Sequence, residues 1–210
     1  MMYPDPLVDL DARVLSVSVN TPSQIVIDRL LRLQNGDDWR EPITLYIAAA
    51  EDNRSVGVLD FLQIHAIIQT LRSPVRTVAL GGMLRGYEVL LLADGERGHR
   101  HILEHSLLCL EPFRFQGLPF TDGPIGMEQV PGLSMREQAE QLLTAEMGVV
   151  LQRLRLEPTL FETARIIGAA EAISRGIADL VVPVAKPNPE PAHKRNHRRQ
   201  EEINNPTNIQ

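Results

Sequence analysis

The sequence contains little cysteine, few aromatic residues and no long apolar run. Its one cysteine, Cys109, stands within the apolar segment 107–110, so the chain can form neither an intramolecular disulfide nor a multi-cysteine metal site. It has no run of about 18 apolar residues, and its N-terminus lacks the basic-then-apolar order of a signal peptide. We therefore expect a soluble, cytoplasmic protein without a membrane partner.

Charges of both signs are present, with a small acidic excess. The net charge of −6 disfavours nonspecific nucleic-acid binding, so we expect no nucleic-acid partner. With 210 residues, of which 43% are hydrophobic, the chain can bury one core. We expect one folded domain over residues 11–185, preceded by a short segment at 1–10. Residues 186–210 are rich in proline and basic side chains, and we expect a disordered, solvated tail there.

Strand-like and helix-like segments alternate along the first half of the chain. Three segments are rich in apolar and β-branched residues, as buried strands are: 13–19, 43–47 and 75–80. Each precedes a segment with apolar residues at helical spacing, and we expect these helices at 21–31, 58–71 and 87–93. Repeated β-α units predict an α/β fold with a largely parallel sheet, helical cover and right-handed crossovers.

The second half continues with strand-like residues and then one long helix. Residues 102–103 and 107–110 have strand character, and residues 135–156 form a single helical pattern. Apolar side chains spread around much of the circumference of that helix. Such a helix is either central in its own domain or shared with another subunit. Because the domain is small, we expect the helix to be shared.

A glycine turn joins the strand at 75–80 to the helix at 87–93. Serine hydrolases often place their nucleophile at a strand–turn–helix junction of this kind. Residues 80–87 contain only glycine, methionine, leucine, arginine and tyrosine. The turn therefore has the layout of an active site but carries no nucleophile.

This order of elements resembles the proteolytic subunit of the Clp protease, the ClpP family, over about residues 11–185. The features that carry the resemblance are Ile43–Ile47, the glycine turn, Ala93–Arg100, the long helix and Glu171–Asp179. The resemblance implies a crotonase-like fold in which heptameric rings stack through a long handle helix. That handle corresponds to Met135–Leu156. It also implies ClpP-type subunits as homo- or hetero-oligomeric partners and a Clp ATPase unfoldase as a further partner, with no cofactor.

By this resemblance, the three catalytic positions of the family fall on residues that cannot act as a serine-protease triad. The serine position corresponds to Gly86, the histidine position to Glu111 and the aspartate position to Leu160. Glycine has no nucleophilic atom, and an ordinary carboxylate is a weak base near neutral pH. A slip of one residue would place Leu110 at the histidine position, and Glu162 is the acid nearest the third position.

The Pro-Gly-Gly oxyanion turn of the family corresponds here to a segment that includes Glu51, Asp52 and Asn53. Glycines in that turn let backbone N–H groups approach the developing negative charge, and loss of one such donor typically costs about 10²- to 10³-fold in rate. The two acidic side chains would also repel that charge. Together with the vacant triad, this turn predicts a chain without peptidase activity of its own.

Other combinations of polar side chains leave an enzymatic interpretation open. Glu111 with Glu88 or Asp94 could form a carboxylate pair for acid–base work on a small acyl substrate, as in related crotonase-like enzymes. Ser55 with His65 has no acid at a suitable spacing, and we interpret Ser55 as a cap.

The remaining histidines and one insertion offer weaker signals. His99, His101 and His105 fit no single geometry as metal ligands, and we interpret them as partly exposed surface histidines. The insertion at 113–133 holds three of the five phenylalanines. It could fill the substrate groove or clasp a neighbouring subunit, but we interpret it as a packed surface loop.

Three hypotheses from different classes follow. The chain is a non-catalytic ClpP-like subunit, structural or regulatory within a ring; or a crotonase-like enzyme that uses carboxylates; or a free-standing binding protein that kept only the fold. The vacant triad and the long apolar helix favour the first hypothesis.

Overall fold

The computed structural model describes residues 8–9, 12–18, 20–35, 39–49, 56–113, 115 and 134–184. Several sequence-based predictions lie outside these residues. They concern the acidic turn at Glu51, Asp52 and Asn53, the cap at Ser55, most of the insertion, and the tail at 186–210.

The larger of two sheets has six strands in the order β1-β2-β3-β4-β6-β9. Their bounds are β1 Val8–Asp9, β2 Val14–Val17, β3 Ile43–Ile47, β4 Val75–Ala79, β6 Arg100–Leu103 and β9 Leu180–Val182. Neighbouring strands are parallel from β2 to β9, which confirms the predicted parallel sheet. The exception is the antiparallel pair β1 and β2, so the sheet begins within the segment that we expected to precede the domain.

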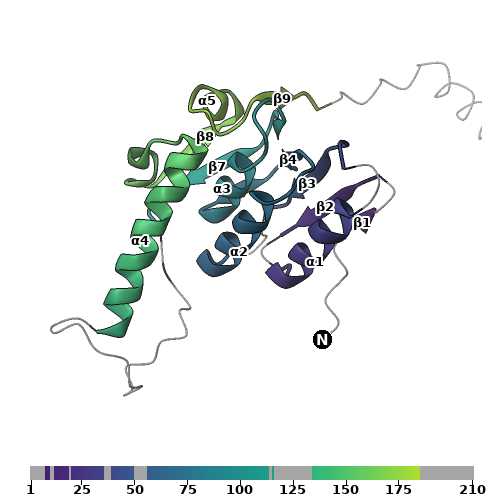
Figure 1. Ribbon diagram of the computed structural model, residues 1–210. Helices are drawn as coiled ribbons and strands as arrows, with labels where there is room; N and C mark the ends of the chain where they lie inside the picture. Colours follow the sequence, from purple (N-terminus) through teal and green to yellow (C-terminus); the bar gives the residue numbers. More distant parts are fainter. Residues whose placement is uncertain are drawn as a thin grey trace, which may run out of the picture.

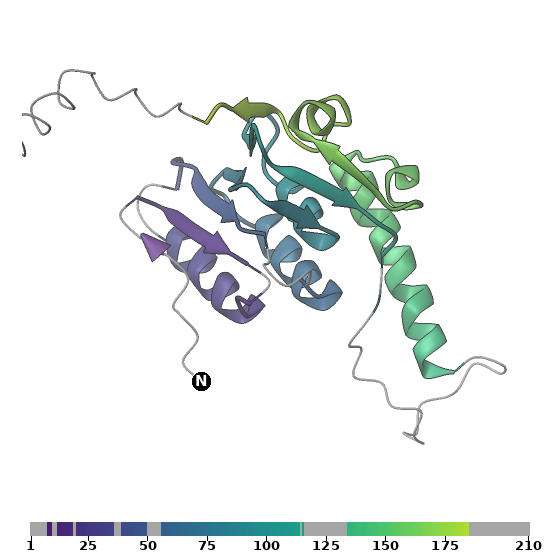
Figure 2. The ribbon, with the colours of Figure 1, turned by 180° about the vertical axis from the view of Figure 1, so that it is seen from behind.

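Three helices cover one face of this sheet: α1 (Ser23–Gln34), α2 (Val58–Ile68) and α3 (Tyr87–Ala93), as Figures 1 and 2 show from opposite sides. All seven residues of α3 are buried, including Glu88 in an otherwise apolar sequence, and a buried helix was predicted here. The core lies between these helices and the inward side chains of β2, β3 and β4. Within the described residues, none of the helices combines the length and apolar character needed to cross a bilayer.

A second sheet has three strands in the order β5-β7-β8, and the sequence analysis did not anticipate it. It consists of β5 (Met83–Arg85), β7 (Leu107–Leu110) and β8 (Arg165–Gly168). Leu84, Leu108 and Ile167 are paired across this sheet, and all three are buried. Only β7 was expected as a strand, because β5 and β8 are short and gain their partners from distant parts of the chain.

The long helix α4 (Met135–Leu154) projects from the domain, and Figures 1 and 2 show its N-terminal half extending away from both sheets. Ser134 and Glu137 form a capping box at its start. It ends two residues before the expected Leu156, because Arg155 adopts a left-handed conformation with φ 56°. The buried residues of α4 all lie in its C-terminal half: Met147, Val150, Leu151 and Leu154.

The last described segment returns to the larger sheet through η1 (Pro158–Phe161), α5 (Ala169–Ser174) and β9. Asp179 holds this segment against β6. Its carboxylate accepts hydrogen bonds from Arg100 Nε at 2.8 Å and from the backbone N–H of Gly98 at 2.8 Å. The Arg100 guanidinium holds the pKa of Asp179 at about 2. This partly buried ion pair ties β6 to the chain just before β9.

Candidate functional site

The glycine segment that was predicted as one turn contains the strand β5: Gly81 and Gly82 lie between β4 and β5, and Gly86 forms a sharp elbow between β5 and α3. Gly81 and Gly82 both have positive φ, and a Cβ on Gly82 would lie 3.0 Å from Ala49 Cβ. Gly86 is the N-cap of α3 with φ 48° and ψ −116°. This strained strand-to-helix conformation is the one in which a nucleophile is presented in serine hydrolases. The backbone of a nucleophile elbow is therefore present, and the residue at its tip has no side chain.

Glu88 holds the elbow from inside the protein. Its Oε2 accepts a hydrogen bond from the Arg85 backbone N–H at 3.0 Å, and the residue is 1% exposed. Oε1 is buried without a hydrogen-bond partner. Burial raises the pKa of Glu88 to about 7, against the opposing effects of the Arg85 N–H and the Arg85 charge. Glu88 therefore stabilises the turn through its hydrogen bond with the Arg85 backbone.

The other two triad positions implied by the resemblance lie on separate elements. Glu111 follows β7 directly and is partly buried, and the adjacent Leu110 is fully buried in the core. Leu160 lies in η1 and is 3% exposed. Glu162, the nearby acid, caps the end of η1 and is exposed. The leucine is thus a core residue.

Aromatic rings accompany all three of these positions. Tyr87 follows Gly86, Phe113 stands two residues after Glu111, and Phe161 follows Leu160. The Tyr87 and Phe113 ring centroids are 5.7 Å apart, and those of Phe113 and Phe161 are 5.0 Å apart.

Phe61 of α2 extends this arrangement, with its ring centroid 5.6 Å from that of Tyr87. We call these four residues, Phe61, Tyr87, Phe113 and Phe161, the aromatic stack. All four rings pack in or against the hydrophobic core. Stacked aromatic pairs at such distances are worth about 0.5–1.5 kcal/mol beyond the area that they bury. Through apolar packing, the stack therefore joins the three elements on which the triad positions lie.

Sequence reasoning missed the aromatic stack. Its members are separated by up to 100 residues along the chain, from Phe61 to Phe161. One signal was available, because Tyr87, Phe113 and Phe161 each stand within two residues of a triad position. That signal has no meaning until the three elements are known to converge.

The structure corrects the expectation that His65 has no acidic partner, because Asp94 supplies one. His65 is 4% exposed, and its Nδ1 lies 2.9 Å from Asp94 Oδ1. The Gln69 Nε2 donates to the same oxygen at 2.9 Å. Burial raises the pKa of Asp94, while the contact with His65 opposes this change.

The position of Asp94 weakens the proposed carboxylate pair with Glu111. Asp94 is the C-cap of α3, whereas Gly86 is its N-cap, so Asp94 lies at the far end of the helix from the elbow. Its Oδ1 is already bonded to His65 and Gln69. Of the two acids considered as partners for Glu111, only Glu88 belongs to the elbow.

The three histidines in and around β6 do not gather into a metal site. His101 lies on β6, His99 precedes this strand and His105 lies in the turn after it. In the part of the chain that the structure describes, no group of three or more histidine, cysteine or acidic side chains is placed to hold a metal ion.

Comparison with known proteins places this geometry in a family. A family model described as Clp protease matches residues 12–185. The ATP-dependent Clp protease proteolytic subunit 4 of Rhodococcus jostii is 32% identical over 160 residues, which cover 76% of this chain and 77% of that protein. Proteolytic subunit 1 of Corynebacterium diphtheriae is 27% identical over 190 residues, covering 89% and 83%.

Solved structures support the same fold. A peptidase of Plasmodium falciparum superimposes with a TM-score of 0.65 at 21% identity, covering 82% of this chain and 96% of that one. The α/β fold of the ClpP type, expected from the resemblance, is thereby confirmed.

Proposed function

The chain belongs to the Clp protease family, and we propose that it is a non-catalytic, ClpP-like subunit that is structural or regulatory within the ring of an ATP-dependent Clp protease complex. The observation that carries this proposal is Gly86. It occupies the tip of an intact nucleophile elbow and offers no atom that can attack a carbonyl.

The other positions of the site agree with this proposal. Glu111 and Leu160 supply neither an imidazole base nor the acid that would orient one. Removal of a single triad member already costs about 10⁴-fold or more in well-studied enzymes.

A role as a subunit is supported by α4. Its N-terminal half has no buried residue, and Leu142 is 73% exposed. Val149, nearer the domain, is 42% exposed. Exposed apolar side chains on a projecting helix are costly in water and are typical of a surface that another chain covers. The handle interaction of the family gives this helix a use that does not depend on catalysis.

Native mass spectrometry combined with a peptidase assay tests the proposal. The chain is analysed alone and mixed with an active ClpP from the same cell, and each assembly is assayed with a fluorogenic peptide and labelled with a fluorophosphonate probe. We expect a homo-oligomeric or mixed ring in which only the active partner is labelled and all activity follows that partner. A partner whose nucleophilic serine is replaced by alanine provides the control, because its mixed ring should be inactive.

Two results would overturn the proposal. A chain that stays monomeric under all these conditions would favour a free-standing binding protein. Peptide cleavage or fluorophosphonate labelling of this chain alone would show that it has a nucleophile of its own.

A crotonase-like enzyme is the second candidate, and Glu88 is the observation in its favour. A buried carboxyl with a pKa of about 7 and one unpartnered oxygen has the properties of a general acid or base. The hydrogen bond that Glu88 accepts from the Arg85 N–H gives it a structural role, and this role accounts for the burial of Glu88 without catalysis. Turnover of a small acyl thioester that disappears in Glu88→Gln while the fold is retained would favour the enzyme.

A further inference from the structure

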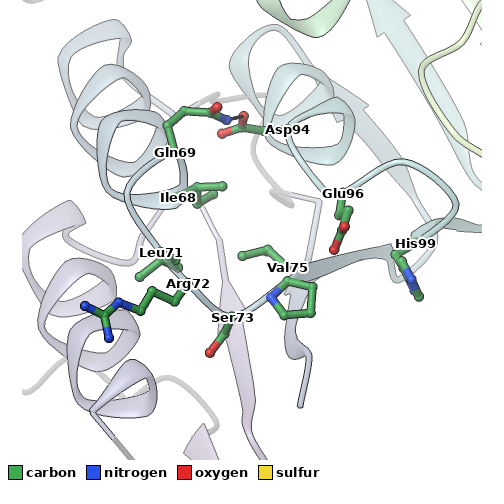
Figure 3. A pocket seen from close by; sticks show the side chains of 10 residues that line it. Ile68, Gln69, Leu71, Arg72, Ser73, Val75, Asp94, Glu96 and His99 are labelled. Atoms are coloured by element: carbon green, nitrogen blue, oxygen red, sulfur yellow. Dashed lines mark hydrogen bonds between the residues drawn. The ribbon is translucent and has the colours of Figure 1, made fainter. Parts of the chain in front are cut away.

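A cavity of about 470 Å³ opens at the end of α3 that is remote from Gly86. It lies between the C-terminal ends of α2 and α3 and the start of β4, as Figure 3 shows. Its lining is mixed: four residues are apolar (Ile68, Leu71, Pro74 and Val75), and of these Leu71 and Pro74 are partly exposed whereas Ile68 and Val75 are buried. Its volume falls within the range of about 300–1,000 Å³ that is usual for small-molecule sites.

The backbone gives this cavity a negative character. Gln69 is the C-cap of α2 and Asp94 is the C-cap of α3, and both residues line the cavity. The C-terminus of a helix carries a partial negative charge from its unsatisfied carbonyl groups. Two such ends face the same space, and the carbonyls of His65, Ile67, Ile68 and Leu92 at these ends already accept hydrogen bonds, so the helix dipoles contribute the charge rather than free carbonyl groups.

Side chains add to the negative character. Glu96, two residues beyond the C-cap of α3, is exposed and lines the cavity. The Asp94 side chain is 0% exposed, burial raises its pKa and its Oδ1 is bonded to His65 and Gln69, so Glu96 is the carboxylate that reaches the cavity. Figure 3 shows the Asp94 carboxylate at the upper edge of the hollow, beside the Gln69 amide that covers it.

The basic side chains at the rim do not cancel this character. Figure 3 shows the Arg72 guanidinium directed outward, away from the hollow, and the His99 ring directed away on the opposite side. The space between them is bounded by apolar side chains, two helix C-termini and the Glu96 carboxylate.

We propose that this cavity is a binding site for a small organic cation with an apolar body, such as a primary alkylammonium. The apolar body lies against Leu71 and Pro74, and the ammonium group lies beside Glu96 and the two helix ends. The site is independent of the vacant elbow and of the proposed role as a subunit.

Saturation-transfer difference NMR on the full chain tests this site, because the method works on large assemblies as well as on monomers. The probe is n-hexylammonium, and 1-hexanol is the neutral molecule of matched length. We expect a saturable signal for hexylammonium at concentrations where hexanol gives none. Glu96→Gln should weaken binding of the cation by about fivefold, as loss of one exposed charge contact allows. Glu104→Gln, which neutralises an exposed acid on the turn after β6, should leave binding unchanged.

Three results would overturn the proposal. Hexanol could bind as well as hexylammonium, which would show that the cavity selects only apolar bodies. Glu96→Gln and Glu104→Gln could have equal effects, which would show that general surface charge attracts the probe. The third result is an absence of saturable binding up to the solubility limit of the probe.

Discussion

Glu88 makes the stability of the elbow depend on pH. Burial raises its pKa from 4.5 to about 7, so the folded protein prefers the protonated form. This preference stabilises the fold fully below pH 4.5 and is lost as the pH rises through about 7, a change of about 2–3 kcal/mol. We expect the free energy of unfolding, measured with urea, to be lower at pH 7.5 than at pH 5. This decrease should be smaller in Glu88→Gln than in the unchanged chain. Equal falls in both proteins would contradict this assignment.

The ion pair of Asp179 and Arg100 predicts a second effect of a single residue. The Arg100 side chain is 5% exposed, so Asp179→Asn would leave a buried guanidinium without its charged partner. Such a loss typically costs about 3 kcal/mol. Asp28→Asn is the matched control, because Asp28 pairs with Arg32 on the surface, where both side chains are about half exposed. Thermal unfolding should show a large decrease in Tm for the first variant and almost none for the second.

Among the elements, the aromatic stack holds α2, α3, η1 and the chain after β7 together. Phe113 occupies its middle, in contact with the rings of both Tyr87 and Phe161. We expect Phe113→Ala to lower the free energy of unfolding by about 2–3 kcal/mol, because the ring is partly buried and has two stacking partners. Phe115→Ala, which removes a partly buried phenylalanine outside the stack, should cost at least 1 kcal/mol less. Equal losses in urea unfolding would show that the stacking adds nothing beyond burial.

For the whole molecule, we expect the projecting half of α4 to decide whether the chain assembles. Leu142→Glu places a charge on an apolar side chain that is 73% exposed, so the fold of the domain should change by less than about 0.5 kcal/mol. If another subunit covers this helix, the same charge should weaken or abolish oligomers in analytical ultracentrifugation. Gln141→Glu adds the same charge at the neighbouring exposed position and serves as the control. Oligomers that are indifferent to Leu142→Glu would exclude this residue from the interface.

Local patterns of the sequence were sufficient for the most deeply buried elements. The strand at 43–47 and the helix at 87–93 have the bounds that their apolar runs predict. Both segments are flanked by turn-forming residues, and their burial makes the apolar pattern dense. The long helix was also predicted, and its end differs by two residues because Arg155 leaves the helical conformation.

By itself, the sequence determined the β-α order, the parallel sheet and, through the family resemblance, a prediction that Gly86, Glu111 and Leu160 leave the triad vacant. Only the tertiary structure decided what surrounds these positions. The second sheet, the pair of His65 and Asp94, and the aromatic stack all join residues that are far apart in the chain. Local propensity is read from neighbours in the sequence, whereas these contacts arise when hydrophobic burial brings distant segments to the same place.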